Sequence, residues 1–167
     1  MTQTESVARA FSCLGQHCAY ELGKGGFDPA LPFPWKTGHL SCDCSGFVAW
    51  CLGVGRHTDH PWYKPVNGGW LETSAIYRDA TTPGYGMFDE VPRDSVGIGD
   101  LVVYGDFHGQ QGHVGIVVNS TADVEVIHCS NGAWKIYADA ISKSPPTHWL
   151  THGGIYVRYV EFSGKIS

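Results

Sequence analysis

The chain has 167 residues, of which 43% are hydrophobic and 16% are charged. This size and composition predict one folded domain over residues 1–167 with a buried core, and they exclude a disordered chain. A formal net charge of -5 at pH 7, and the lack of any apolar run near the ~18 residues of a bilayer span, argue against nucleic acid and membranes as partners.

The first half of the chain has helical spacing. Apolar side chains recur at three- and four-residue steps over residues 6–22, which predicts a helix. Glycines and prolines predict a loop over residues 23–40. A second helix is expected over residues 43–52, closed by two glycines, and a short one over residues 70–78.

The second half of the chain changes to strand-like patterns. Residues 81–96 are rich in turn formers and predict no regular element. About five β-rich runs follow, separated by turns. They lie at residues 101–104, 113–118, 124–129, 134–137 and 155–162. Helices followed by an antiparallel sheet predict an α+β fold.

Cys44 is the strongest candidate for a nucleophile. It lies at the first turn of a predicted helix, directly after a long loop. Unpaired N–H groups and the helix dipole favour a thiolate there, and the same N–H groups suit an oxyanion. The alternative is an inert buried thiol on the apolar stripe of the helix. Asp43 has a second interpretation as well, namely a simple helix N-cap.

Two histidines indicate a base for this cysteine. If the turn after Val118 is symmetric, Val118 faces Asp123 and His113 then falls directly opposite His128. Opposed side chains on one face lie ~4.5–5.5 Å apart at Cβ, so one imidazole can orient the other. A β-bulge would shift this register. The alternative is a pair of histidines satisfied by solvent or backbone, but their common face favours a catalytic pair.

The other cysteines form no disulfide pattern of the small secreted kind. Cys13, Cys18 and Cys51 lie among apolar helical neighbours, and we expect buried thiols there rather than disulfides. A zinc-binding module that uses Cys42, Cys44, His113 and His128 is an alternative function, although Cys-x-Cys is a poor zinc spacing and no second pair supports it. We expect no metal or cofactor.

Four short segments together resemble the NlpC-type cell-wall peptidases, a branch of the papain-like cysteine peptidases. The family has an Asp-Cys-Ser-Gly segment opening a helix, a Gly-Asp-Leu strand, a His-Val-Gly-Ile strand and a third polar residue on the next strand. The matches come in the family's order at residues 43–46, 99–101, 113–116 and 127–128. The resemblance implies a papain-like NlpC-type core, with the cysteine helix packed on an antiparallel sheet.

The resemblance also implies roles for single residues. Cys44 would be the nucleophile, His113 the general base and His128 the group that orients it. Tyr20 resembles a tyrosine that lines the site near the oxyanion, although the tryptophan usual before the following Gly-Gly is absent. Asp43 and Ser45 match positions that hold the free amino end of the stem peptide in some relatives.

The loops depart from the family's pattern. Residues 27–42 form a longer link than usual, and residues 57–95 form a long aromatic segment. Their aromatic side chains, Trp35, Trp62, Tyr63 and Trp70, would wall a substrate groove or simply pack on the sheet.

The resemblance implies a cysteine hydrolase of peptidoglycan stem peptides that cleaves the bond between D-glutamate and the diamino acid. A related thiol hydrolase or acyltransferase toxin with a protein target is the alternative. The start of the chain carries no long apolar stretch, so we expect synthesis in the cytoplasm without a signal peptide. Delivery to the periplasm or wall would then use a dedicated apparatus such as type VI secretion, with an inhibitor (immunity) protein protecting the producing cell.

Overall fold

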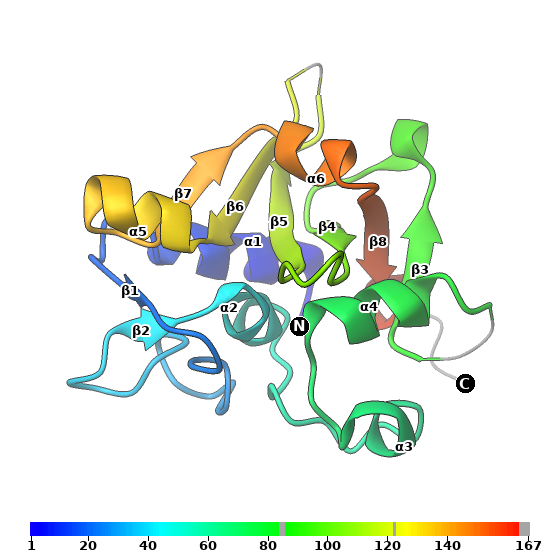
Figure 1. Ribbon diagram of the computed structural model, residues 1–167, viewed down its shortest axis with the longest axis horizontal. Coiled ribbons are helices and arrows are strands. Elements are labelled where there is room, and N and C mark those ends of the chain that lie inside the picture. Colours follow the sequence, from blue (N-terminus) through cyan, green and yellow to red (C-terminus); the bar gives the residue numbers. More distant parts are fainter. Residues whose placement is uncertain (84–85, 122, 164–167) are drawn as a thin grey trace.

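The fold is α+β, as the sequence predicts. The computed structural model describes residues 1–83, 86–121 and 123–163, and Figure 1 shows their arrangement. The helices are α1 (Gln3–Ser12), α2 (Cys44–Cys51), α3 (Tyr63–Asn67), α4 (Thr73–Ala80), α5 (Asn131–Tyr137) and α6 (Thr147–Thr151). The strands are β1 (Ala19–Tyr20), β2 (Ser41–Cys42), β3 (Phe88–Val91), β4 (Leu101–Tyr104), β5 (His113–Asn119), β6 (Glu125–Cys129), β7 (Ile141–Ser144) and β8 (Ile155–Tyr159). Short 3-10 turns lie at Arg93–Ser95 and Val160–Ser163.

Within the described residues, six strands form one antiparallel sheet in the order β3-β8-β4-β5-β6-β7. About five were expected. β3 lies in the stretch predicted to be turns, and β7 was also missed. The run at residues 134–137 is not a strand, because Ser130 caps a helix there by accepting a hydrogen bond from the N–H of Ala133.

The first helix is shorter than predicted. Thr2 and Glu5 form a capping box at its start, and the helix ends at Ser12. Gly15 and His17 then adopt positive φ angles of 73° and 57°, which helical backbone does not allow. The chain turns into β1, which pairs in parallel with β2 and so brings Tyr20 beside Cys42.

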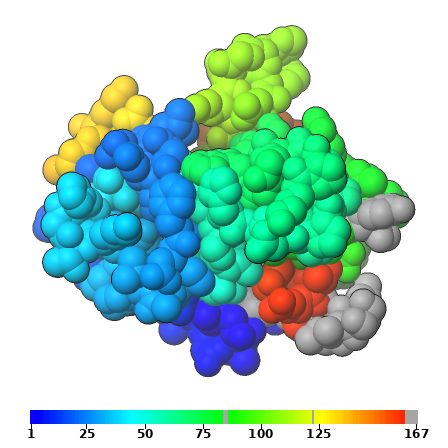
Figure 2. Space-filling model, turned by 90° about the horizontal axis from the view of Figure 1, so that it is seen from below, coloured from blue at the N-terminus to red at the C-terminus, as the bar shows by residue number. Residues whose placement is uncertain are grey.

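The sheet separates two apolar layers. The main core lies between the sheet and helices α1, α2 and α4, and α2 contributes all eight of its residues to the buried interior. The other face of the sheet carries a smaller core around Trp149 of α6. In Figure 2 the blue-to-cyan loop before α2 and the green segment after it lie side by side across one face of the molecule.

None of the helices in residues 1–83, 86–121 and 123–163 combines the length and apolar composition that crossing a membrane requires.

Candidate active site

Cys44 is the first residue of α2, as predicted. Asp43 is the N-cap, and its side chain accepts a hydrogen bond of 2.9 Å from the N–H of Gly46. The side chain of Cys44 is only 6% exposed. It lines a cavity of about 230 Å³ together with Tyr20 and Trp70. The little of Cys44 that is exposed borders this cavity.

The resting state of Cys44 differs from the sequence-based expectation of a thiolate. Burial, followed by the negative charge of Asp43, raises the pKa of the Cys44 thiol to about 12. Hydrogen bonds with the backbone of Val114 and Ser45 lower the pKa and offset part of this rise. Cys44 does lie at the start of a helix, but burial raises its pKa by more than the helix start lowers it. Cys44 therefore rests as a neutral thiol.

The two histidines are paired, but in a register other than the predicted one. Ile116 faces Ile127 and a bulge lies between Val117 and Asn119, so His128 is opposite Gly115 and not opposite His113. The shift is two residues, which keeps both imidazoles on one face of the sheet. They meet as diagonal neighbours, with His113 Nε2 2.8 Å from His128 Nδ1. The expected contact is confirmed although the expected register is wrong.

The chain of hydrogen bonds extends one residue beyond the predicted set. Ser144 Oγ of β7 lies 2.9 Å from His128 Nε2. Trp149 stacks on His113 at 5.1 Å between ring centroids and meets His128 edge-on at 4.9 Å. These contacts fix both rings. Because Nε2 of His113 is occupied, Nδ1 is the nitrogen left for a thiol.

Burial keeps both histidines neutral. It lowers the pKa of His113 well below 6.5, and the nearby His128 and His148 lower it further. Burial, followed by the charge of His148, lowers the pKa of His128 to about 4. A neutral imidazole at position 113 can accept a proton at pH 7.

Cys44 and the histidines line two neighbouring cavities. The histidine cavity, about 430 Å³, is lined by His113, His128 and Trp149. It shares Tyr20, Gln111 and Gly112 with the cavity of Cys44. Helix α2, which begins at Cys44, packs against β5, which begins at His113, and this packing joins the two halves.

Tyr20 borders the site, and its role near the oxyanion stays a prediction. It is half-buried on β1 and lines both cavities. Burial raises the pKa of its phenol, and the negative charge of Asp43 adds to this. The hydroxyl is therefore a donor at neutral pH.

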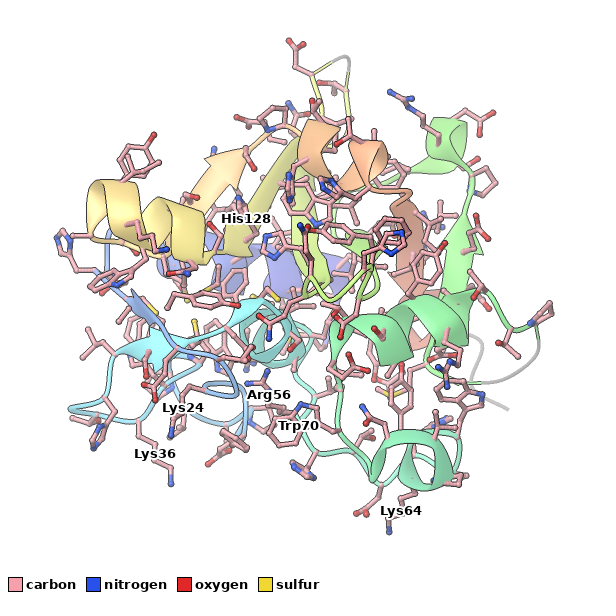
Figure 3. The ribbon with its side chains drawn as sticks, in the orientation of Figure 1. Lys24, Lys36, Arg56, Lys64, Trp70 and His128 are labelled. Atoms are coloured by element: carbon pink, nitrogen blue, oxygen red, sulfur yellow. The ribbon has the colours of Figure 1, made fainter. Side chains whose placement is uncertain are left out.

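Asp43 and Ser45 belong to a buried polar network around Arg56. Arg56 is 1% exposed, pairs with the Asp43 carboxylate and donates a hydrogen bond of 2.7 Å to Ser45 Oγ. The N–H of Gly23 donates to the other Asp43 oxygen at 2.6 Å. Arg56 also lies over the ring of Trp70 at 4.8 Å, and Figure 3 shows these two side chains together. Asp43 is thus a helix cap and an ion-pair partner, and binding of a substrate amine there stays a prediction.

The structure decides between alternatives that the sequence left open for neighbouring side chains. Among the described residues, the ligand atoms that converge within 4.8 Å are the sulfurs of Cys18, Cys42 and Cys129, so the alternative zinc set of Cys42, Cys44, His113 and His128 is not assembled. The groove prediction holds for Trp70, but Tyr63 is fully buried and donates to Asp79 at 2.8 Å.

Arg56, Ser144 and Trp149 are the site residues that the sequence analysis missed. All three lie outside the four matched segments. Arg56 is in a loop, Ser144 is in a strand that was not predicted, and Trp149 is in a helix that was not predicted. The sequence could have indicated Ser144 if β7 had been recognised as a strand. Ser144 pairs with Val126, which lies two residues before His128 on β6. Arg56 has no local signal.

Comparison with known proteins shows the fold. No family model matches the sequence, and no curated protein matches it. NlpC1 from Trichomonas vaginalis superposes with a TM-score of 0.50 at 16% identity, over 94% of this chain and 43% of that one. The P60 domain of the M. avium subspecies paratuberculosis antigen MAP1204 has a TM-score of 0.46 at 18% identity, over 86% of this chain and 84% of that one. The chain therefore spans less than half of NlpC1 and has an NlpC-type fold.

Proposed function

We propose that this chain, whose fold is of the NlpC type, is a cysteine hydrolase that cleaves peptidoglycan stem peptides. The observation that carries the proposal is the hydrogen-bonded chain from His113 through His128 to Ser144, beside a helix-start cysteine in an adjoining cavity. A nucleophile, a base and an orienting group are the parts that covalent hydrolysis needs.

The proposed mechanism starts from a neutral Cys44 thiol and a neutral His113 imidazole. Nδ1 of His113 takes the proton of the Cys44 thiol as the sulfur attacks an amide carbonyl. The backbone N–H of Cys44 and the Tyr20 hydroxyl hold the oxyanion. Protonated His113, steadied by His128, then gives its proton to the leaving amine. Water, deprotonated by His113, releases the acyl group and restores the thiol.

The cavity of Cys44 supports a substrate with an amine. Its lining includes three carboxylates, Asp43, Glu72 and Asp106, and one guanidinium, Arg56. Asp43 is paired with Arg56, whereas Glu72 and Asp106 accept hydrogen bonds from the backbone N–H groups of Ala75 and Gly112 and form no ion pair among the described residues. A negative cavity wall favours a cationic group, such as the free amino end of a stem peptide.

The bond proposed for cleavage is the one between D-glutamate and the diamino acid. Purified chain should convert muropeptides to products that end in D-glutamate and to fragments with a free diamino acid amine, measured by liquid chromatography and mass spectrometry. The Cys44→Ala variant is the matched control and should give no products. Release of whole stem peptides from muramic acid would mean an amidase acting at the sugar. Opening of cross-links alone would move the cut to the D-alanine bridge.

Delivery as an antibacterial effector, with an inhibitor protein in the producing cell, is part of the proposal. Export of the chain to the periplasm of a Gram-negative host should cause lysis, and the Cys44→Ala variant should not. Cytoplasmic expression should be tolerated. Equal toxicity in both compartments would instead favour the alternative, a thiol hydrolase or acyltransferase with a protein target in the cytosol.

A further inference from the structure

Three cysteine side chains meet in the interior, away from the proposed nucleophile. Cys18 Sγ is 3.4 Å from Cys42 Sγ, and Cys42 Sγ is 3.3 Å from Cys129 Sγ. All three sulfurs lie within 4.8 Å of one another, and all three residues are 0% exposed. The sequence separations are 24 and 87 residues, so the fold and not a local motif brings them together.

Burial alone does not explain this cluster. Cys13 and Cys51 are also free and 0% exposed, yet neither belongs to it. Thiols in an apolar core need no polar partner, whereas these three hydrogen-bond with one another and with backbone oxygens. Cys18 Sγ lies 3.3 Å from the carbonyl oxygen of Ala19. Cys129 Sγ lies 3.3 Å from the carbonyl oxygen of Cys42.

The spacing fits a metal ion bound by thiolates. Sulfurs that share one zinc ion lie about 3.8 Å apart, because each Zn–S bond is about 2.3 Å long and the geometry is tetrahedral. The Cys18–Cys42 and Cys42–Cys129 sulfur distances of 3.4 and 3.3 Å are a few tenths of an ångström shorter than this, and the third pair lies within 4.8 Å. Thiolates select soft cations, Zn²⁺ and Cu⁺ above all, over Mg²⁺ or Ca²⁺.

We propose that Cys18, Cys42 and Cys129 form a three-sulfur site for a thiophilic d¹⁰ cation, Zn²⁺ or Cu⁺. Each cysteine that binds as a thiolate releases its proton to solvent, and a backbone carbonyl or water completes the zinc coordination. The proposal does not depend on the proposed function. It has a consequence for the site, because Cys18 precedes Tyr20, Cys42 precedes Cys44, and Cys129 follows His128. One ion would tie together the three segments that carry these residues.

The test is metal binding by the full, reduced chain. Zn²⁺ and, under anaerobic conditions, Cu⁺ are added in separate arms, and the metal that stays with the protein after gel filtration is counted by mass spectrometry. We expect about one ion per chain in at least one arm, and the arm identifies the cation. The combined Cys18→Ser, Cys42→Ser and Cys129→Ser variant should lose it. A matched variant with Cys13→Ser and Cys51→Ser, two equally buried thiols, should keep it.

A second measurement uses only the wild-type chain, so it tests the proposal even if the triple variant fails to fold. X-ray absorption on the loaded wild-type chain should count three sulfur neighbours, at about 2.3 Å for zinc. The proposal is overturned if the folded, reduced chain retains neither ion. It is overturned equally if fewer than three sulfurs surround the bound ion, or if the folded triple variant binds as much metal as the wild type.

Discussion

At the scale of single residues, His113 holds the position on which the proposed chemistry depends. One ring nitrogen is fixed by His128, the ring is stacked on Trp149, and burial keeps the imidazole neutral. In the proposed mechanism, His128 and Ser144 act on the substrate only through His113. The three positions should therefore differ in the size of their effect on turnover.

We expect His113→Ala to lower kcat/KM by about three orders of magnitude or more, as loss of a base does in other nucleophilic enzymes. His128→Ala should cost about 10- to 100-fold, because the base remains but loses its orientation. Ser144→Ala should cost less again. Steady-state kinetics on a purified muropeptide would measure this order. A loss at Ser144 equal to that at His113 would contradict the proposed roles.

The pKa of His113 sets the acid side of the pH profile. Because burial lowers it below 6.5, His113 stays neutral, and so able to take a proton, down to a pH below that value. The acid limb of kcat/KM against pH should therefore have its midpoint below pH 6.5. Circular dichroism at each pH would control for unfolding. A midpoint above pH 7 would mean that His113 is not the base or is not buried in the working enzyme.

At the scale of elements, the β5–β6 hairpin brings the histidines together only because Gly115 faces His128. A Cβ at Gly115 would lie 2.4 Å from Val126 Cγ1 and 3.1 Å from His128 Cβ. A side chain there would force the Val126 side chain to move and would crowd His128 and the carbonyl oxygen of Ile127, 3.2 Å away.

Gly115→Ala should therefore destabilise the fold by about 1–3 kcal/mol, as overpacking of a tight interior does. Gly132, in helix α5, provides the matched control, since a Cβ there meets nothing closer than 4.0 Å. Gly132→Ala should stabilise the fold by up to about 1 kcal/mol through helix propensity. Urea unfolding of both variants would decide. Equal stability of the Gly115 variant and the wild type would show that the strands do not pack this closely.

The sequence predicted those elements whose signals are local. The N-cap and apolar run of α2 placed Cys44 correctly, and the assumption of a symmetric turn after Val118 placed His113 and His128 on one face. The bulge after Val117 was not predictable, because it has no residue signature, yet a two-residue shift preserves the face. Residues 134–137 were misassigned because an aromatic and β-branched run outweighed the Ser130 cap. Arg56 and the three-cysteine cluster depend on contacts between distant segments, which spacing does not show.

At the scale of the whole molecule, Arg56 joins the long loops to the active-site helix. Its guanidinium donates to the carbonyl oxygens of Lys24 at 2.6 Å and Gly25 at 3.3 Å, and it pairs with Asp43. The side chain lies between the loop before α2 and the segment after it. Its loss would leave the Asp43 carboxylate buried without a cation.

Arg56→Ala should cost about 3–5 kcal/mol in the free energy of unfolding, the usual effect of breaking a buried ion pair. Lys64 is the matched control, because its ion pair with Asp59 is exposed on the surface, where pairs add little. Lys64→Ala should leave the unfolding midpoint in urea unchanged. Similar stability of the two variants would show that Arg56 does not hold the loops together.

The central claim is that Cys44 attacks the substrate and carries its acyl group. The most direct measurement mixes the chain with a purified muropeptide, quenches in acid within the first turnovers, and maps the modified peptide by mass spectrometry. The proposed mechanism predicts an acid-stable thioester on Cys44, absent from the other cysteines. Cys44→Ala should show neither adduct nor turnover, while Cys51→Ala, at the other end of the same helix, should show both. Continued turnover by a folded Cys44→Ala variant would contradict the claim.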